Sequence, residues 1–589
     1  MDHLKRFIAR LDQRIEALEH VSRRFSWIRL GVFLAGLAAV LVWWDSDGRW
    51  GSVVVAAAAF LMVVRLHDRV LSGLTRLRTY RRIKELRIAR IRRDWDGLPP
   101  ASDEPVPPDH PFAWDLDLVG PRSVHRLLDT AFSTGGSHLL AEWLTSAPPG
   151  ARERQRLVRS LVGLTAFCDR IAILSTVFGK RGDRFDSSVL SVWLERPVEE
   201  RRIRGVLLIL SGLAAVTAVL AVLHLLGVAG PQWAFSLTAY AAVYLMNGRL
   251  YGHLFDEAET LHSELEKLRP VVRYLERYRG PRPLEEHLAP FRGERPPSRV
   301  LRRVMWLAVA ASAQKSEVLR LVLNAIAPWD LYFTWRLNRV RLQLRDDLPR
   351  WLDCVFKLEA AASLATFAAL NPEATFPGLG GDGFEAEGLG HPLIPRDALV
   401  RNDLRSEAGG KVVLVTGSNM SGKSTFLRAV GIAQAMAAAG GPVDAAALRS
   451  APFTLLSSMG IRDSVTDGIS YFYAEVRRLG AMMRTARSSE GPCLVLIDEI
   501  FRGTNNRERL EGSRAILREL AGLNCLALVA THDLDLVRLE ESLPGVRNVH
   551  FREEVSGGRM TFDYLLHDGP CPTTNALKIM ALEGLPVPD

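Results

Sequence analysis

The chain has 589 residues, of which 48% are hydrophobic and 24% charged, and its formal net charge is +9 at pH 7. This length allows three or four domains, and the composition fits a chain with both membrane and soluble parts. The five cysteines are scattered without a CxxC or histidine pairing, so the sequence speaks against a disulfide scaffold or zinc finger and predicts reduced core cysteines.

The first 64 residues predict a charged helix followed by a membrane hairpin. Residues 1–27 form the N-terminal cytoplasmic helix, which lacks the layout of a cleavable signal. Residues 28–44 and 50–64 are uncharged after Arg29 and are separated by the loop DSDGR, which predicts transmembrane hairpin 1 at 28–64. Each half is short for a bilayer core of about 30 Å, which needs around 20 residues. A buried or re-entrant helix pair therefore stays open as the alternative.

Residues 65–96 predict a basic juxtamembrane helix, because 65–93 carry eleven Arg or Lys among leucines and isoleucines at helical spacing. Three interpretations are open: a helix along anionic headgroups, which the position after a span favours, a solvated or lever-type helix, and a nucleic-acid contact. The proline-rich segment 97–111 then predicts a linker.

The middle of the chain predicts helices interrupted by a second hairpin. Residues 112–204 form the first part of a helical core, and 205–246 form transmembrane hairpin 2, in which 205–230 meet the length of a span and Pro231-Gln232 leads into the apolar run 233–246. Residues 247–370 form the second part of the core and lever, including an amphipathic helix at 253–277 with a kink at Pro270.

The distribution of Arg and Lys predicts the orientation of both hairpins. Basic residues crowd the segments before the first span, after the second and before the third, whereas the two hairpin loops hold only Arg49. Because basic residues favour the cytoplasmic side, the ends of both hairpins are expected there. The sequence therefore predicts a multi-pass protein of the cell membrane with its C-terminal domain in the cytoplasm.

Residues 411–424, KVVLVTGSNMSGKS, predict a strand, a phosphate-binding P-loop and the start of a helix. Glycines allow close approach of phosphate, Lys423 reaches the β- and γ-phosphates, and the Ser424 hydroxyl ligates Mg²⁺. The chain is therefore expected to bind ATP with Mg²⁺. The predicted ATP-binding residues are Gly417, Ser418, Asn419, Met420, Ser421, Gly422, Lys423, Ser424 and Thr425.

Two further apolar runs each end in polar residues that suit ATP hydrolysis. Residues 491–506 predict a buried parallel strand that ends at Asp498, a second Mg²⁺ ligand, and Glu499, which orients or deprotonates the attacking water. Residues 525–536 predict another strand closed by His532, which senses or polarises the γ-phosphate. Glu499 and His532 are thus the predicted catalytic residues.

Five ordered blocks resemble the C-terminal ATPase domain of the MutS proteins, which belong to the ABC-type ATPase superfamily. They are GSNMSGKST, DSVTDGISYFYAEVRRL at 463–479, DEIFRGTNN, THD, and 561–586. The resemblance covers roughly 385–589 of a predicted domain at 371–589, and His391 and Pro392 are similar to the family's entry motif. More weakly, 112–148 looks like the helical core segment that precedes the lever helices in MutS proteins.

The resemblance implies a homodimer with composite sites, in which Ser470 reaches the partner's nucleotide. It also implies binding of mismatched or branched DNA in DNA mismatch repair. Departures are Tyr471 in place of a usual threonine, Ser418 in place of a proline, and Thr574-Asn575 in place of an aromatic-glycine pair. They leave the phosphate chemistry intact and put the adenine-side contacts and the interface in question.

Together these features predict an α/β P-loop ABC-type ATPase domain, an all-α core and lever region, and two transmembrane helical hairpins. The expected function is membrane-anchored, ATP-dependent DNA binding in repair, with hydrolysis moving the helical levers. Membrane spans stand where the family's mismatch-reading domain would be. The alternative is therefore a membrane-coupled ATPase that remodels a protein or lipid partner without DNA. A transporter is disfavoured, because the spans are uncharged apart from Arg29 and there is no LSGGQ-type signature.

Overall fold

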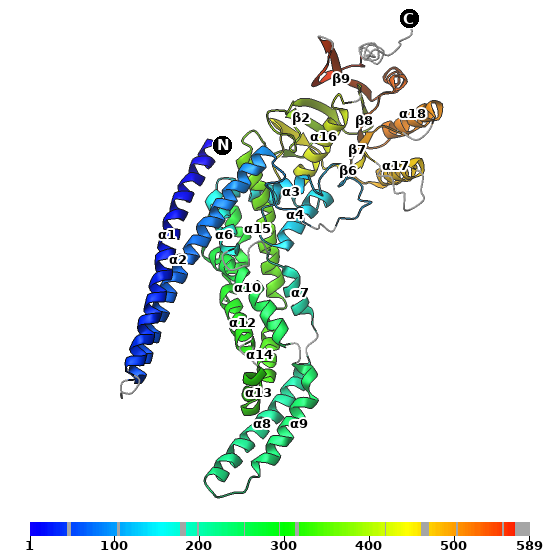
Figure 1. Ribbon diagram of the computed structural model, residues 1–589. Coiled ribbons are helices and arrows are strands. Elements are labelled where there is room, and N and C mark those ends of the chain that lie inside the picture. The colour runs from blue at the N-terminus through cyan, green and yellow to red at the C-terminus, as the bar shows by residue number, and fades with distance from the viewer. Residues whose placement is uncertain are drawn as a thin grey trace. The chain divides into compact units, whose positions relative to one another are not determined.

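The computed structural model describes most of the chain (Figure 1). The described residues are 1–43, 49–102, 106–176, 184–196, 199–251, 254–293, 295–312, 317–418, 420–460, 471–501, 505–556 and 559–571. They form two compact units. The first comprises Met1–Glu85, Ala131–Gly136 and Ala166–Leu358, and the second comprises Leu86–Thr130, Ser137–Thr165 and Glu359–Asp589.

The first unit begins with two long antiparallel helices, α1 (Asp2–Val42) and α2 (Arg49–Arg92), which lie side by side in Figure 1. Ion pairs join them where both are polar, from Arg78 to Glu19 and from Arg81 to Asp12, each at 2.6 Å. The basic stretch is therefore the direct continuation of the second predicted span and pairs with the N-terminal helix. This arrangement favours the lever-type interpretation over a helix lying along the headgroups, because a continuous helix cannot leave a span and turn flat.

Three helices in the described parts are long and apolar enough to cross a membrane, namely α1, α2 and α8 (Glu200–Leu225). A shorter apolar helix, α9 (Trp233–Met246), follows α8 and packs against it as a hairpin. The apolar windows of all three long helices are almost entirely exposed in the folded chain. Such long, exposed apolar surfaces need an apolar surrounding, since water would disfavour them.

The rest of the first unit is helical. In Figure 1, α10 and α12 run side by side, and α14 packs against α12 and α8. Along α10, the predicted apolar stripe Leu261, Leu265, Leu268, Val272 and Leu275 is buried, and Pro270 lies inside the helix. The bounds are α6 (Thr165–Thr176), α7 (Ser187–Glu195), η1 (Gly248–Leu250), α10 (Leu254–Arg277), α11 (Arg282–His287), η2 (Ala289–Arg292), α12 (Pro297–Ser312), α13 (Glu317–Ile326), α14 (Trp329–Leu344) and α15 (Asp347–Leu370).

The second unit contains a small helical part formed by α3 (Val124–Leu128), α4 (Thr134–Ser146), α5 (Ala151–Val162) and the end of α15. Ser123 caps α3 by accepting a hydrogen bond from the Arg126 N–H at 3.2 Å. The leucines of α3 and α4 and Trp143 are buried, except Leu139, which is half-buried. The buried ones are Leu127, Leu128, Leu140, Trp143 and Leu144.

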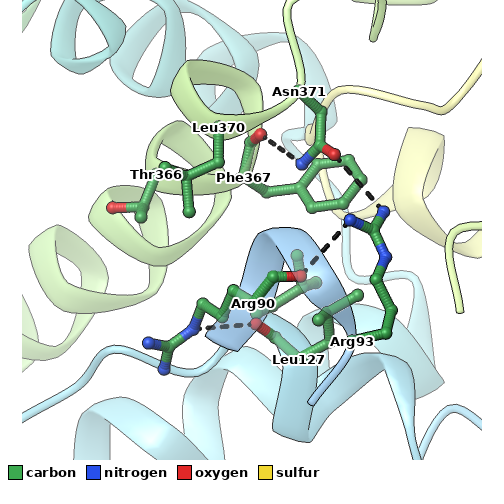
Figure 2. A pocket seen from close by; sticks show the side chains of 8 residues that line it. Arg90, Arg93, Leu127, Thr366, Phe367, Leu370 and Asn371 are labelled. Atoms are coloured by element: carbon green, nitrogen blue, oxygen red, sulfur yellow. Dashed lines mark hydrogen bonds between the residues drawn. The ribbon is translucent and has the colours of Figure 1, made fainter. Parts of the chain in front are cut away.

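Two buried arginines at the end of α2 join α3 to the residue that follows α15 (Figure 2). The Arg90 Nε donates to the Leu127 carbonyl at 3.0 Å, and the Arg93 Nη2 donates to Asn371 Oδ1 at 3.3 Å. The Arg93 Nε also donates to the carbonyl of Pro392 at 3.0 Å, and burial lowers the pKa of Arg93. These side chains line a small pocket, in which the guanidinium groups donate hydrogen bonds to main-chain carbonyls. The pocket therefore has a structural role.

The remainder of the second unit is α/β, with two sheets. The six-stranded sheet has the order β10-β9-β4-β8-β7-β6, parallel except for β10, and the four-stranded sheet has the order β1-β5-β2-β3. The strands are β1 (Gly378–Leu379), β2 (Gly383–Leu389), β3 (Asn402–Glu407), β4 (Lys411–Thr416), β5 (Ala447–Ser450), β6 (Thr454–Ser458), β7 (Cys493–Asp498), β8 (Cys525–Ala530), β9 (Val546–Ser556) and β10 (Arg559–Asp568).

Helices cover both faces of the six-stranded sheet, which explains why its central strands are apolar throughout. The strands β4, β7 and β8 are almost wholly buried, as the unbroken apolar runs predict. Helices α17 and α18 share one core with alternate residues of these strands, and α16 packs on β6, β7 and β8. The helices are α16 (Lys423–Ala438), α17 (Tyr471–Ser488), α18 (Asn506–Gly522), the short η4 (Leu534–Leu536) and α19 (Leu539–Ser542).

Candidate functional site

The loop between β4 and α16 has a backbone that requires its two glycines. Gly417 has a φ of 143° and Gly422 a φ of 110°, which side chains other than glycine rarely adopt. A Cβ at Gly417 would also lie 2.8 Å from Ser421 Oγ and 2.9 Å from the Phe551 carbonyl oxygen. The predicted strand, loop and helix are present, and α16 begins at Lys423, directly after the loop.

Lys423 is folded back onto this loop and is only 5% exposed. Its Nζ donates to the carbonyls of Gly417 at 2.7 Å and Ser418 at 2.6 Å. Burial lowers the pKa of Lys423, while the nearby charges of Glu499 and Asp498 oppose that shift. The side chain thus places a cation under the loop and beside two carboxylates.

Asp498 and Ser424 meet at the carboxyl edge of the sheet, where β7 ends beside the first turn of α16. The Ser424 hydroxyl donates to Asp498 Oδ2 at 2.8 Å. Hydroxyl and carboxylate oxygens are ligands that Mg²⁺ accepts, and proteins commonly bind this ion through one or two carboxylates plus substrate phosphates. No cluster of three or more His, Cys, Asp or Glu able to hold a metal occurs in the described ranges, so the pair fits a substrate-dependent site rather than a closed protein cage.

Glu499 and His532 form the second contact at this edge. The His532 Nδ1 lies 3.0 Å from Glu499 Oε1, and the histidine side chain is 47% exposed whereas the glutamate side chain is 19% exposed. Glu499 has a positive φ of 65°, an uncommon conformation for a side chain other than glycine, and its N–H donates to the Ala530 carbonyl at 3.0 Å. The turn after β7 therefore aims the Glu499 side chain away from that of Asp498 and toward the end of β8.

Two serine hydroxyls of the loop suit a ligand rich in hydrogen-bond acceptors. Within the residues that the structure describes, the buried Ser418 Oγ and Ser421 Oγ make no hydrogen bond. Buried hydroxyls without partners are disfavoured, and phosphate oxygens are strong acceptors. The loop, Lys423 and the Ser424–Asp498 pair thus fit a nucleoside triphosphate with Mg²⁺.

Some predicted residues contribute differently or lie outside the described ranges. Met420 is 87% exposed with a φ of 69°, and Thr425 is exposed on the first turn of α16. The side chains of Asn419 and Ser470 lie outside the described residues, as do Thr574 and Asn575. The buried entry-motif residue His391 accepts a hydrogen bond at Nδ1 from the Leu393 N–H at 3.3 Å, and burial lowers its pKa to about 4.

Glu475 is a site-supporting residue that sequence reasoning missed. It lies on α17, is buried, and its Oε1 accepts a hydrogen bond from the Phe501 N–H at 2.8 Å, just after Asp498 and Glu499. The sequence feature that could have identified Glu475 is its position as a single acidic residue on the apolar face of α17, four positions before Leu479 and eight before Met483. Glu475 therefore supports the turn that carries the two carboxylates.

Asp115 is a second missed residue, and it connects the helical part of this unit to the sheet. Its buried Oδ2 accepts hydrogen bonds from the Ser457 hydroxyl at 2.8 Å, the Met459 N–H at 2.9 Å and the Arg478 Nη2 at 2.7 Å. Because Ser457 lies on β6 and Arg478 on α17, one carboxylate joins three segments of the second unit. Sequence alone could not pair residues more than 340 positions apart.

Comparison with known proteins agrees with this geometry, because residues 413–588 match the family model of MutS domain V. This C-terminal part of the chain is similar to the MutS family. The chain is 31% identical to the DNA mismatch repair protein MutS of Thermotoga maritima over 252 residues. This region makes up 42% of this chain and 30% of that protein. The chain is also 32% identical to DNA mismatch repair protein MutS 2 of Halobacterium salinarum over 238 residues, which make up 39% of this chain and 27% of that protein.

The shared part is thus under a third of the length of these relatives. The domain V match includes the loop after β4, both carboxylates and His532, but begins well after the candidate membrane helices. The similarity to MutS proteins therefore concerns the C-terminal part and carries no information on the first half of the chain.

Proposed function

We propose that this MutS-family chain is a Mg²⁺-dependent ATPase anchored in the cell membrane by two helical hairpins. One observation carries the enzymatic part, namely that Lys423, the Ser424–Asp498 pair and the Glu499–His532 pair meet at the carboxyl edge of one sheet. A cation, a metal-ligand pair and a carboxylate base in one place are the parts that phosphoryl transfer to water needs.

Each residue has a defined part in this proposal. The loop 417–425 and Lys423 bind the phosphates, and Ser424 and Asp498 hold Mg²⁺, which supplies charge neutralisation when bound. Glu499 orients the attacking water and accepts its proton, and His532 holds the Glu499 carboxylate through their hydrogen bond. Ser470 of one protomer completes the site of the other in a homodimer, as the family resemblance implies.

The membrane part rests on the exposed apolar surfaces of α1, α2, α8 and α9. Three of these helices have the length and composition of a span, and α9 pairs with α8. The arginine-poor hairpin loops put the ends of both hairpins in the cytoplasm. The ATPase domain then lies in the compartment that holds ATP.

For the partner, we propose DNA with mismatches or branches, bound in an ATP-dependent manner with movement of the helical levers. The support is that the relatives are named DNA mismatch repair proteins. A second candidate is remodelling of a protein or lipid partner without DNA. Its support is the helical hairpins of the first unit, which the similarity to those relatives does not explain.

The test measures ATP hydrolysis by the full-length protein in detergent, without DNA and with matched, mismatched and branched duplexes, at several salt concentrations. A Lys423→Ala variant gives the background rate. Stimulation that depends on DNA structure and fades with salt supports the DNA role. A rate that ignores every DNA and rises with anionic lipid refutes that role and supports remodelling, and a rate equal to that of Lys423→Ala refutes the ATPase itself.

A further inference from the structure

The region around α13 presents an apolar surface that none of the roles above uses. On α13, Leu321 is 74% and Ile326 70% exposed, and Val322 is exposed beside them. Trp306 on α12 is 62% exposed, and Tyr332 on α14 is also exposed. The opposite side of α13 contributes Asn324, which is buried. This helix is therefore amphipathic with its apolar face outward, the reverse of a helix that serves a water-soluble core.

Hydrogen bonds fix α13 and the start of α14 beside α9. The Tyr240 hydroxyl on α9 donates to the main-chain carbonyl of Asn324, and the Tyr244 hydroxyl donates to Asp330 Oδ2 at 2.8 Å. Arg320 completes the network by donating from Nε to the same Asp330 oxygen at 2.9 Å. A helix rises 1.5 Å per residue, so Tyr240 lies about 9 Å before the end of α9 at Met246. The C-terminal half of α13 is therefore level with the last turns of an apolar hairpin helix.

The residue types around this network match a membrane–water boundary. Trp and Tyr concentrate at that boundary, and aromatic side chains cluster here through contacts of Phe333 with Trp306, Trp329 and Tyr332. Arginines stand beside them, with Arg336 over the Tyr332 ring and Arg339 over the Trp335 ring. Exposed Arg302 and Arg303 lie on the neighbouring helix α12. Such cations complement anionic headgroups.

We propose that the α13 face, defined as Trp306, Leu321, Val322, Ile326 and Tyr332, inserts into the headgroup–acyl boundary of the same bilayer that hairpin 2 spans. The proposal rests on the membrane insertion of α8 and α9. The occupant is lipid because hydrogen bonds from Tyr240 and Tyr244 hold this exposed apolar face beside the apolar hairpin helix α9. The helical region of the first unit then contacts the membrane in two ways, through hairpin 2 and through the α13 face beside it. Two contacts restrict the tilt of this region relative to the bilayer.

The experiment uses the full-length protein reconstituted into vesicles of phosphatidylcholine and phosphatidylglycerol. Single cysteines carry an environment-sensitive fluorophore in a chain that also has Cys168→Ser and Cys571→Ser, because the other three cysteines are buried. The sites are Leu321→Cys for the α13 face, Val216→Cys for the apolar surface of α8, and Glu286→Cys on the exposed surface of α11 for water. Brominated lipids, with bromine near the headgroup or near the chain end, quench probes that contact them.

We expect the Leu321→Cys probe to emit at shorter wavelength than the Glu286→Cys probe and to lose intensity with the shallow bromine more than with the deep one. Quenching at Val216→Cys with none at Leu321→Cys overturns this inference and leaves the membrane proposal standing. Absence of quenching at both sites overturns both. A blue shift at Leu321→Cys without quenching by either lipid indicates that protein covers the face, from a second copy or another partner, and also overturns the inference.

Discussion

At the scale of single residues, the contact between Glu499 and His532 separates binding from hydrolysis. We expect Glu499→Gln to retain ATP binding, because the loop and Lys423 are untouched, and to lose on the order of 100-fold or more in turnover, because an amide cannot accept the proton. Binding of a fluorescent ATP analogue and release of phosphate measure the two properties. Glu490→Gln, an exposed carboxylate before β7, is the matched control. Unaltered hydrolysis in Glu499→Gln would remove this residue from the role.

His391 gives the second unit a defined pH dependence. Burial lowers its pKa from 6.5 to about 4, so the unfolded chain binds a proton between these values that the folded domain does not. This contribution to stability is complete above pH 6.5 and is lost as pH falls toward 4. At pH 5 the loss is roughly 2 kcal/mol.

The measurement compares thermal unfolding at pH 7 and pH 5 for the original chain and His391→Asn. The amide oxygen of asparagine can accept the hydrogen bond from the Leu393 N–H but does not titrate. Other titrating groups are common to both proteins, so the original chain should lose more stability on acidification. Equal losses of stability in the two proteins would show that the protonation of His391 does not differ between the folded and the unfolded chain in this pH range.

At the scale of elements, Asp115 holds the turn segment before α3 against β6 and α17. Asp115→Ala leaves the Arg478 guanidinium, the Ser457 hydroxyl and the Met459 N–H without their buried acceptor, and we expect a loss of roughly 3 kcal/mol. Glu511→Ala is the control, since its pair with Arg514 at 3.3 Å lies on the exposed face of α18 and is worth less than about 1 kcal/mol. Chemical unfolding followed by tryptophan fluorescence compares them. Similar losses in both variants would contradict the structural role of Asp115.

The helix α2 illustrates how pairing between elements adds information to interpretations that sequence leaves open. Its basic half could have met lipid, solvent or nucleic acid. Two of its arginines, Arg78 and Arg81, pair with Glu19 and Asp12 on α1, and a buried Lys84 pairs with Asp169 at 2.5 Å. These pairs favour a helix that packs on protein, and periodicity within α2 contains no information about its partners.

At the scale of the whole molecule, the proposed topology predicts which surfaces face the cytoplasm. In the chain with Cys168→Ser and Cys571→Ser, we expect Gly230→Cys, between α8 and α9, to react with a membrane-impermeant maleimide in intact cells. A Cβ at Gly230 meets no atom within 4 Å, so the substitution fits. Glu490→Cys in the ATPase domain should react only after permeabilisation. Labelling of Glu490→Cys in intact cells would invert the proposed orientation.

The sequence by itself predicted the contiguous features of the chain. The apolar runs at 28–44, 50–64 and 205–230, the loop from Gly417 to Thr425, and the apolar strands before Asp498 and His532 are all written in consecutive residues. Strand, glycine turn and helix start follow from local periodicity and backbone freedom, so the order of elements in the candidate site could be predicted. The parallel strands β4, β7 and β8 also bring their carboxyl ends to one edge, where Ser424 contacts Asp498 and Glu499 contacts His532.

Only the tertiary structure decided which distant residues face one another. Glu475 supports the turn after β7, Asp115 joins β6 and α17, Arg93 reaches Pro392, and Tyr240 and Tyr244 fix α13 and α14 beside α9. Each contact links residues separated by tens to hundreds of positions, and its energy comes from burial and hydrogen-bond satisfaction that exist only after packing. A sequence pattern specifies which face of a helix is apolar, but the packed neighbours determine whether protein covers that face or leaves it, as on α13, turned outward.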